Sequence, residues 1–99
     1  MKMANGYNPS IMGGMKCYLC GTIFNLVRHE VFFGPNRQKS KAEGCWCYLC
    51  APHHNLSNYS PHMNREVDLK LKRDCQKKWM EKNGKTEEDF RREFGKSYL

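Results

Sequence analysis

The residues best suited to chemistry are cysteines and histidines that stand in closely spaced pairs. Cys17 and Cys20 are separated by two residues, a spacing from which two thiolates can clamp one zinc ion at a tight turn. A tetrahedral site needs two more ligands, and the sequence offers these candidates: Cys45, Cys47, Cys50, His53 and His54. The sequence therefore predicts a structural zinc site, and its two remaining ligands must come from these five residues.

Two assignments of these remaining ligands compete. Cys47 with Cys50 would complete a four-cysteine site, whereas Cys50 with His53 would complete a site of three cysteines and one histidine. If Cys45 and Cys47 share one face of a strand, both can serve as small core residues. Cys50 then lies at the strand end, before the turn at Pro52. This argument favours Cys50 and His53.

The surrounding sequence predicts the elements that position these ligands. Residues 25–33 are rich in β-branched and aromatic side chains and predict a strand, and residues 45–49 predict a second one. We expect the two strands to pair antiparallel across a polar loop at residues 34–44. A short helix is expected within residues 53–60.

Two further helices are expected towards the C-terminal end. The first covers residues 64–82, where an apolar side chain recurs every four residues. This stripe consists of Val67, Leu71, Cys75 and Trp79. Gly84 follows as a stop signal. Thr86 and Asp89 resemble a capping box, which predicts a last short helix over residues 86–95.

These elements predict an α+β fold in which a small zinc-stapled hairpin and helix precede one or two C-terminal helices. The 99 residues suffice for one small domain, and domains of this size commonly need a metal or disulfides as reinforcement. Residues 1–14 are rich in Gly, Asn, Ser and Pro. We expect them to form a flexible leader before a single zinc-stabilised domain at residues 15–99.

Net charge and hydropathy limit the classes of partner and the cellular locations that we expect for the chain. The net charge of +7 favours a polyanionic partner, nucleic acid before an anionic membrane. No apolar run approaches the roughly 20 residues of a membrane span, and the first residues lack the features of a secretory signal. We therefore expect no membrane partner and a cytoplasmic location, where thiols stay reduced and clustered cysteines bind metal.

With these residues in place, the pattern resembles the zinc-bracketed HNH nucleases of the ββα-metal superfamily. More narrowly, it looks like small phage-encoded proteins of this type, including recombination-associated nucleases. The matching stretches are Cys-Tyr-Leu-Cys at 17–20, Arg-His-Glu-Val at 28–31 and Leu-Cys-Ala-Pro-His-His at 49–54. The resemblance covers about residues 17–64. It implies metal-dependent hydrolysis of phosphodiester bonds, in DNA before RNA, within a bacterial or phage-infected cell.

The resemblance also implies roles for the remaining histidines. His29 matches the strand histidine that acts as general base on a water molecule. His54 matches the helix-borne ligand of the catalytic metal, which would be Mg²⁺, Mn²⁺, Ni²⁺ or Zn²⁺. His62 would be a further ligand of the same ion. A histidine with a pKa near the ordinary value of about 6.5 can accept a proton at neutral pH.

Two positions depart from the family pattern. Arg28 stands where the family has an Asp or His metal ligand, and Cys45 lies near the place of the family asparagine. If the register slips by one residue, His29 becomes the ligand and Glu30 the base. Strand alternation turns Glu30 to the opposite face, which favours His29 as base. Three asparagines are candidate substitutes: Asn36, Asn58 and Asn64.

Candidate contacts with nucleic acid are basic and aromatic. The candidates for phosphate contact are Arg37, Lys39, Lys41 and Arg65. Trp46 and Tyr48 face away from the neighbouring cysteines and could stack on bases, but we expect them to pack against the 64–82 helix.

A different class of function remains open. The chain could be a non-catalytic, zinc-stapled module that binds nucleic acid or protein, including an inhibitor on a retired nuclease scaffold. A protein partner in recombination or host interaction belongs to this alternative. A pure zinc module has no need of His29, His54 and His62, so these histidines favour the enzyme.

Overall fold

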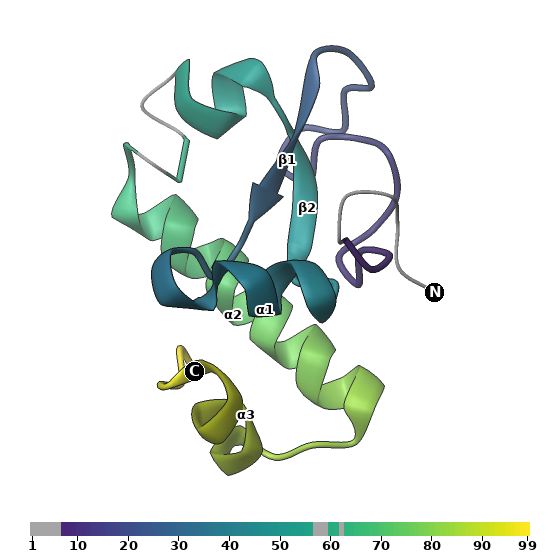
Figure 1. The fold of residues 1–99 in the computed structure, drawn as a ribbon. Helices are drawn as coiled ribbons and strands as arrows, with labels where there is room; N and C mark the ends of the chain where they lie inside the picture. The colour runs from purple at the N-terminus through teal and green to yellow at the C-terminus, as the bar shows by residue number, and fades with distance from the viewer. Residues whose placement is uncertain (1–6, 57–59, 62) are drawn as a thin grey trace.

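Two antiparallel strands form the centre of the computed structural model, which describes residues 7–56, 60, 61 and 63–99. β1 (Leu26–Glu30) pairs with β2 (Trp46–Cys50) (Figure 1). In this register His29 lies opposite Cys47. The predicted hairpin is confirmed, although β1 is shorter than the predicted strand. Beyond β1, the Val31 N–H still donates to the Cys45 carbonyl oxygen at 3.0 Å, and Val31 and Phe32 are both buried.

The connection between the strands differs from the expected polar loop. It contains a short turn η1 (Gly34–Asn36) and a helix α1 (Arg37–Ala42). Pro35 occupies the first turn and the lysines and Ala42 that follow are good helix formers, which explains the helix. The Ser40 hydroxyl is buried and donates to the Phe32 carbonyl oxygen at 2.6 Å, which fixes α1 against the end of β1.

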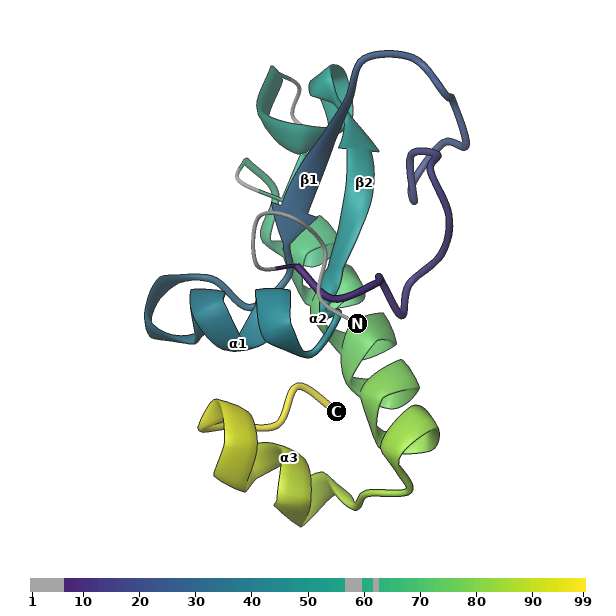
Figure 2. The same cartoon turned by 45° about the vertical axis from the view of Figure 1, so that its right-hand side comes forward.

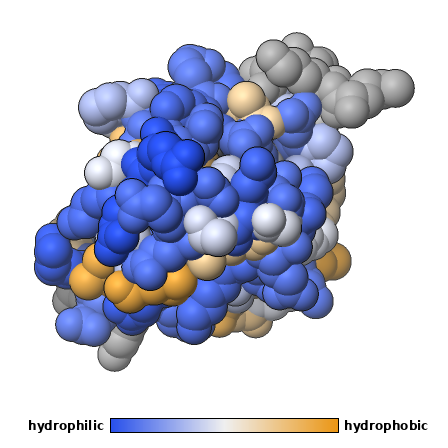
Figure 3. Space-filling view, turned by 90° about the horizontal axis from the view of Figure 1, so that it is seen from below, coloured by the Kyte–Doolittle hydropathy of each residue, from blue (hydrophilic) through white to orange (hydrophobic). Residues whose placement is uncertain are grey.

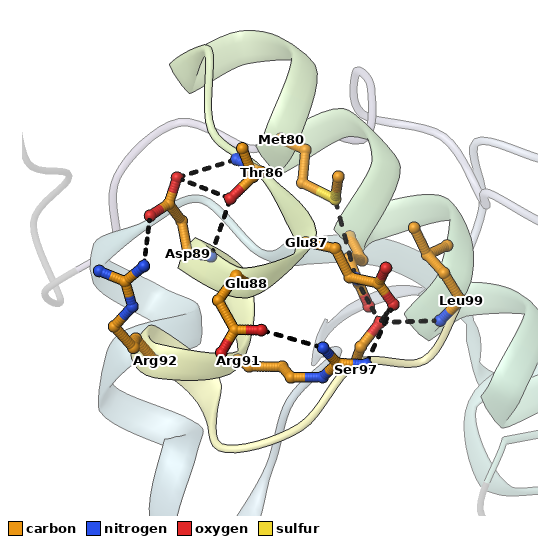
Figure 4. Close-up of polar contacts among 10 residues, drawn as sticks. Met80, Thr86, Glu87, Glu88, Asp89, Arg91, Arg92, Ser97 and Leu99 are labelled. Atoms are coloured by element: carbon orange, nitrogen blue, oxygen red, sulfur yellow. Dashed lines mark hydrogen bonds and ion pairs between the residues drawn. The ribbon is translucent and has the colours of Figure 1, made fainter.

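The two C-terminal helices confirm the prediction that was made from the capping residues and the apolar stripe. α2 (Arg65–Asn83) begins after Asn64, whose side chain accepts hydrogen bonds from two backbone N–H groups, and it ends at Gly84 in the left-handed conformation. α3 (Glu87–Phe94) begins with a reciprocal capping box between Thr86 and Asp89 (Figure 4). These caps satisfy donors that a helix N-terminus leaves without partners.

The main core lies between the hairpin and α2, with α3 closing the far end (Figure 2). Alternate residues of β2 meet the apolar stripe of α2, and the two phenylalanines of α3 stack at 4.6 Å beside it. The central buried residues of this core are Phe32, Cys45, Cys47, Leu49, Leu71, Cys75, Trp79, Phe90 and Phe94. The fold is therefore α+β, as the sequence predicts.

The opposite face of the hairpin is covered by the N-terminal segment. Tyr7 is buried and packs edge to face on Trp46 at 5.2 Å. The Trp46 Nε1–H donates to the Asn8 carbonyl oxygen at 2.7 Å. The part of the expected flexible leader that contains Tyr7 and Asn8 is thus packed on the sheet, whereas Gly13 and Gly14 are exposed. Trp46 packs on this segment, and not on α2 as expected, because the strand turns it to the other face.

The remaining helical piece is a short turn η2 (Pro52–Leu56), directly after β2 and within the region where a helix was expected. Among the described residues, no helix has the length and apolar character needed to cross a membrane. The face seen from below in Figure 1 is largely hydrophilic, with only limited hydrophobic areas (Figure 3). The clustered cysteine and histidine donors lie at the end of β2, in η2 and in the turn at residues 17–20.

Candidate metal centre and histidine pocket

Three elements bring the first set of ligands together. Cys17 and Cys20 lie on a tight turn that is closed by a hydrogen bond from the Gly21 N–H to the Cys17 carbonyl oxygen at 2.8 Å. Gly21 has a φ of +80°, which favours glycine at this point. The Tyr18 N–H donates to the Tyr48 carbonyl oxygen at 2.9 Å and so docks the turn on β2. Cys50, at the end of β2, and the start of η2 complete the arrangement.

The donor atoms of Cys17, Cys20, Cys50 and His53 all lie within 4.8 Å of one another. The two sulphurs of Cys20 and Cys50 are 3.8 Å apart, and His53 Nδ1 lies 3.2 Å from the Cys50 sulphur and 3.7 Å from the Cys17 sulphur. Zinc bond lengths of about 2.3 Å to sulphur and about 2.0–2.1 Å to nitrogen give tetrahedral edges of about 3.8 Å and about 3.6 Å. The cluster could therefore hold a metal ion.

The second candidate assignment, the four-cysteine site, does not form. Cys47 lies on β2 opposite His29 and is not among the clustered donors. Cys45, Cys47 and Cys75 are buried in the core. All six cysteines of the chain are free thiols, so this domain has no disulfide reinforcement. The choice of Cys50 and His53 agrees with the structure.

The thiols of the cluster differ in acidity. Burial opposes ionisation of Cys17, but backbone N–H groups of its own turn and of Cys50 donate to it and lower its pKa from 9.0 to about 6. Burial and the neighbouring thiols raise the pKa of Cys50. Burial raises the pKa of Cys47 to about 12, so this thiol stays protonated at neutral pH. The Cys17 thiol is thus largely ionised at neutral pH, and a bound cation would favour ionisation of the other two cysteines of the cluster.

A second group of side chains lies beside the metal cluster. The imidazole rings of His29, on β1, and His54, on η2, meet edge to face with centroids 5.5 Å apart. Both line a cavity of about 440 Å³. The cavity lining comprises Arg28, His29, Glu30, Phe33, Gly34, Arg37 and His54. Because His54 directly follows His53, the metal cluster and the cavity share one backbone segment.

Glu30 has partners other than the two histidines. Its carboxylate accepts from the Tyr7 hydroxyl at 2.8 Å and from Arg37 Nε at 3.1 Å. Burial opposes ionisation, but these hydrogen bonds outweigh it and lower the pKa of Glu30. Glu30 is thus an ionised, anchored carboxylate. The predicted alternation is consistent with this arrangement, because Glu30 contacts the N-terminal segment while His29 meets His54.

The four predicted phosphate contacts are spread over the surface. Arg37 pairs with Glu30, and the Lys41 ammonium lies over the Tyr7 ring at 4.9 Å from its centroid. Lys39 donates to the Glu93 carbonyl oxygen. Arg65 is exposed at the first turn of α2. Of these residues only Arg37 lines the histidine cavity.

Other predicted positions have structural roles or lie outside the described residues. The Asn36 amide donates to the Phe94 carbonyl oxygen at 2.8 Å, and Asn64 caps α2. His62 and Asn58 lie outside the described residues. Sequence reasoning missed the contribution of Tyr7, whose isolated position in a polar segment gives no periodic signal. It also treated Arg28 only as a departure, although this residue lines the cavity.

No family model matches the chain, and no curated protein or solved structure matches it either.

Proposed function

We propose that the chain is a metal-dependent endonuclease that hydrolyses phosphodiester bonds in DNA. The observation that supports this proposal is the meeting of His29 and His54, from two different elements, in one cavity that two arginines also line. Imidazoles can move protons or ligate a cation near neutral pH, and arginines recognise phosphate. The resemblance of the sequence to zinc-bracketed HNH nucleases points in the same direction.

The roles follow from position. His29 is buried on β1, where packing fixes its ring, and it would accept the proton of the attacking water. His54 would hold a divalent ion, which supplies charge neutralisation at the scissile phosphate when bound. An imidazole donor suits Ni²⁺ or Zn²⁺, whereas Mg²⁺ or Mn²⁺ would depend more on phosphate and water oxygens. Arg37 stands at the cavity wall as a phosphate contact.

The proposal includes a structural zinc ion held by Cys17, Cys20, Cys50 and His53. Its support is that the four donor atoms lie within 4.8 Å of one another, and that three of their separations, 3.2–3.8 Å, are near the edges of a tetrahedral zinc site. Zinc at this point would tie the N-terminal turn, β2 and η2 together. Because thiolate ligands need reducing surroundings, the proposal places the protein in the cytoplasm.

The alternative is a zinc-stapled module that binds nucleic acid or protein without cutting. Two observations favour it. Arg28 lines the cavity and cannot ligate a metal, and the Glu30 carboxylate is held by Tyr7 and Arg37. A nuclease fold that has lost its catalytic residues would have such residues in its cavity.

The experiment that separates the two functions measures cutting and binding on the same DNA. Zinc-loaded full chain is incubated with supercoiled plasmid and, in turn, Mg²⁺, Mn²⁺, Ni²⁺ or additional Zn²⁺, with a metal-free sample as the control. The nuclease predicts nicked plasmid in at least one metal and none without it. Retarded but intact plasmid under all conditions would contradict the nuclease and support the binding module.

A further inference from the structure

Arg28 is held in place by aromatic rings. Its guanidinium carbon lies over the Tyr7 ring at 4.8 Å from the centroid and over the Trp46 ring at 5.6 Å. Both distances are within the roughly 6 Å over which a ring face attracts a cation. Such contacts use the positive charge and leave the N–H donors of the guanidinium for other partners. Arg28 is therefore a positioned cation.

At least one hydrogen-bond donor of Arg28 is not used within the described part of the chain. Its Nε is buried and has no hydrogen-bond partner within residues 7–56, 60, 61 and 63–99. Over the same part of the chain, no ion pair includes Arg28. A buried donor without a partner is unfavourable, and it is more so in a charged group. A ligand that accepts from this guanidinium would remove that penalty.

The cavity that Arg28 lines has an excess of positive charge. Arg28 and Arg37 contribute two cations, and Glu30 is the single carboxylate in the lining. Glu30 is already paired with Arg37 at 3.1 Å. The charge of Arg28 is thus not neutralised by a carboxylate in the cavity lining. This balance favours an anion as the ligand.

We propose that Arg28 is the oxyanion-binding residue of this cavity and that it takes two oxygens of a phosphodiester. The planar guanidinium presents parallel N–H donors that match two oxygens of one phosphate group. The identity of the ligand as a phosphodiester rests on the proposed nuclease function. The inference gives Arg28 a role of its own at a position where a metal ligand would otherwise be expected.

The test observes Arg28 directly and does not use cutting. Full-length, zinc-loaded, ¹⁵N-labelled protein is titrated at constant ionic strength with inorganic phosphate and, in a second arm, with the dinucleotide TpT, which has one phosphodiester. We expect the Arg28 Nε–H resonance to shift saturably in both arms and not with chloride. Saturation by inorganic phosphate alone would restrict the site to free phosphate and overturn the phosphodiester ligand.

Variants test the guanidinium shape separately from the charge. Arg28→Ala and Arg28→Lys should each weaken TpT binding about ten-fold or more, because lysine keeps the charge and lacks the planar fork. Arg92→Ala is the matched control, since it also removes one cation but lies on α3 in a pair with Asp89. It should leave the affinity unchanged.

The two proposals fail separately. If the Arg28 resonance of the wild type moves no more than that of Arg92, the inference is overturned, whatever the variants do and whether or not plasmid is cut. If Arg28 responds to TpT while plasmid stays intact in every metal, the oxyanion site stands and the nuclease proposal falls.

Discussion

His29 and His54 meet edge to face, with ring centroids 5.5 Å apart and planes inclined at 71°, although they come from β1 and η2. His54 directly follows His53, whose Nδ1 lies 3.2 Å from the Cys50 sulphur. The metal cluster therefore sets the position of one of the two cavity histidines. If the cluster holds a structural ion as proposed, loss of that ion should disturb the histidine cavity.

The metal cluster leads to a prediction about zinc content. Cys50→Ser should reduce bound zinc from one ion per chain to well below one and lower the melting temperature, because structural zinc contributes folding free energy. Elemental analysis after gel filtration, with thermal unfolding followed by circular dichroism, measures both. Cys47→Ser is the matched control on the same strand and should retain the ion. Equal zinc in both variants would contradict the assignment of Cys50.

The buried thiols lead to a prediction about alkylation. In the native zinc-loaded protein at pH 7, Cys47 and Cys75 should resist iodoacetamide, because burial raises the pKa of Cys47 to about 12 and that of Cys75 well above its ordinary value. Cys20 is exposed and should react once a chelator is added. Peptide mass spectrometry identifies the labelled sites. Labelling of Cys47 before chelation or denaturation would show that this thiol is not in the core.

The contact between Tyr7 and Glu30 leads to a prediction about titration. The Tyr7 hydroxyl stabilises the ionised carboxylate, so Tyr7→Phe should raise the pKa of Glu30 towards its ordinary value of 4.5. In the wild type the stabilisation is present above pH 4.5 and is lost as the pH falls through the lower folded pKa. The carboxyl ¹³C shift of Glu30 followed against pH measures this midpoint. An unchanged midpoint in the variant would contradict the contact.

A buried glutamine connects α2 to the C-terminal residues. Gln76 Oε1 accepts from the Tyr98 N–H at 2.7 Å, and its Nε2 donates to the Ser97 hydroxyl at 2.9 Å. The Ser97 hydroxyl in turn donates to Glu87 at 2.6 Å (Figure 4). Gln76→Ala should lower the free energy of unfolding by about 2 kcal/mol, since it removes two hydrogen bonds at a fully buried position.

Urea denaturation at pH 7 measures the effect of Gln76→Ala. Gln38→Ala is the control, because Gln38 is exposed on α1 and a substitution there should change stability by less than about 0.5 kcal/mol. If the two variants lose equal stability, the network around Gln76 does not hold the C-terminal residues in place.

Helices whose first and last turns are marked by capping residues could be predicted from the sequence. α2 begins after Asn64 and ends before Gly84, and each of these residues carries its own capping chemistry. The capping box of Thr86 likewise placed α3. Strand alternation favoured Cys50 and His53 as ligands, because it turns Cys47 towards the core and leaves Cys50 at the strand end.

The features that sequence reasoning could not predict depend on tertiary contacts. α1 is largely polar and buries only Ser40, so it shows no apolar stripe and was expected to be a loop. Tyr7 packs on Trp46 through a contact that spans most of the first half of the chain. The aromatic environment of Arg28 arises from this same contact, so the role inferred for Arg28 required the structure.

The most direct test of the proposed nuclease compares the cutting rates of histidine variants. His29→Ala and His54→Ala are measured on supercoiled plasmid with the metal that best supports the wild type. Val27→Ala, an exposed position on the same strand, is the control. We predict that both histidine variants lose at least about 100-fold in rate, as expected for a proton-transfer group or a metal ligand, while zinc content stays at one per chain. Cutting that persists in either zinc-loaded variant at the rate of the Val27→Ala control would contradict the assignment of this cavity as the catalytic site.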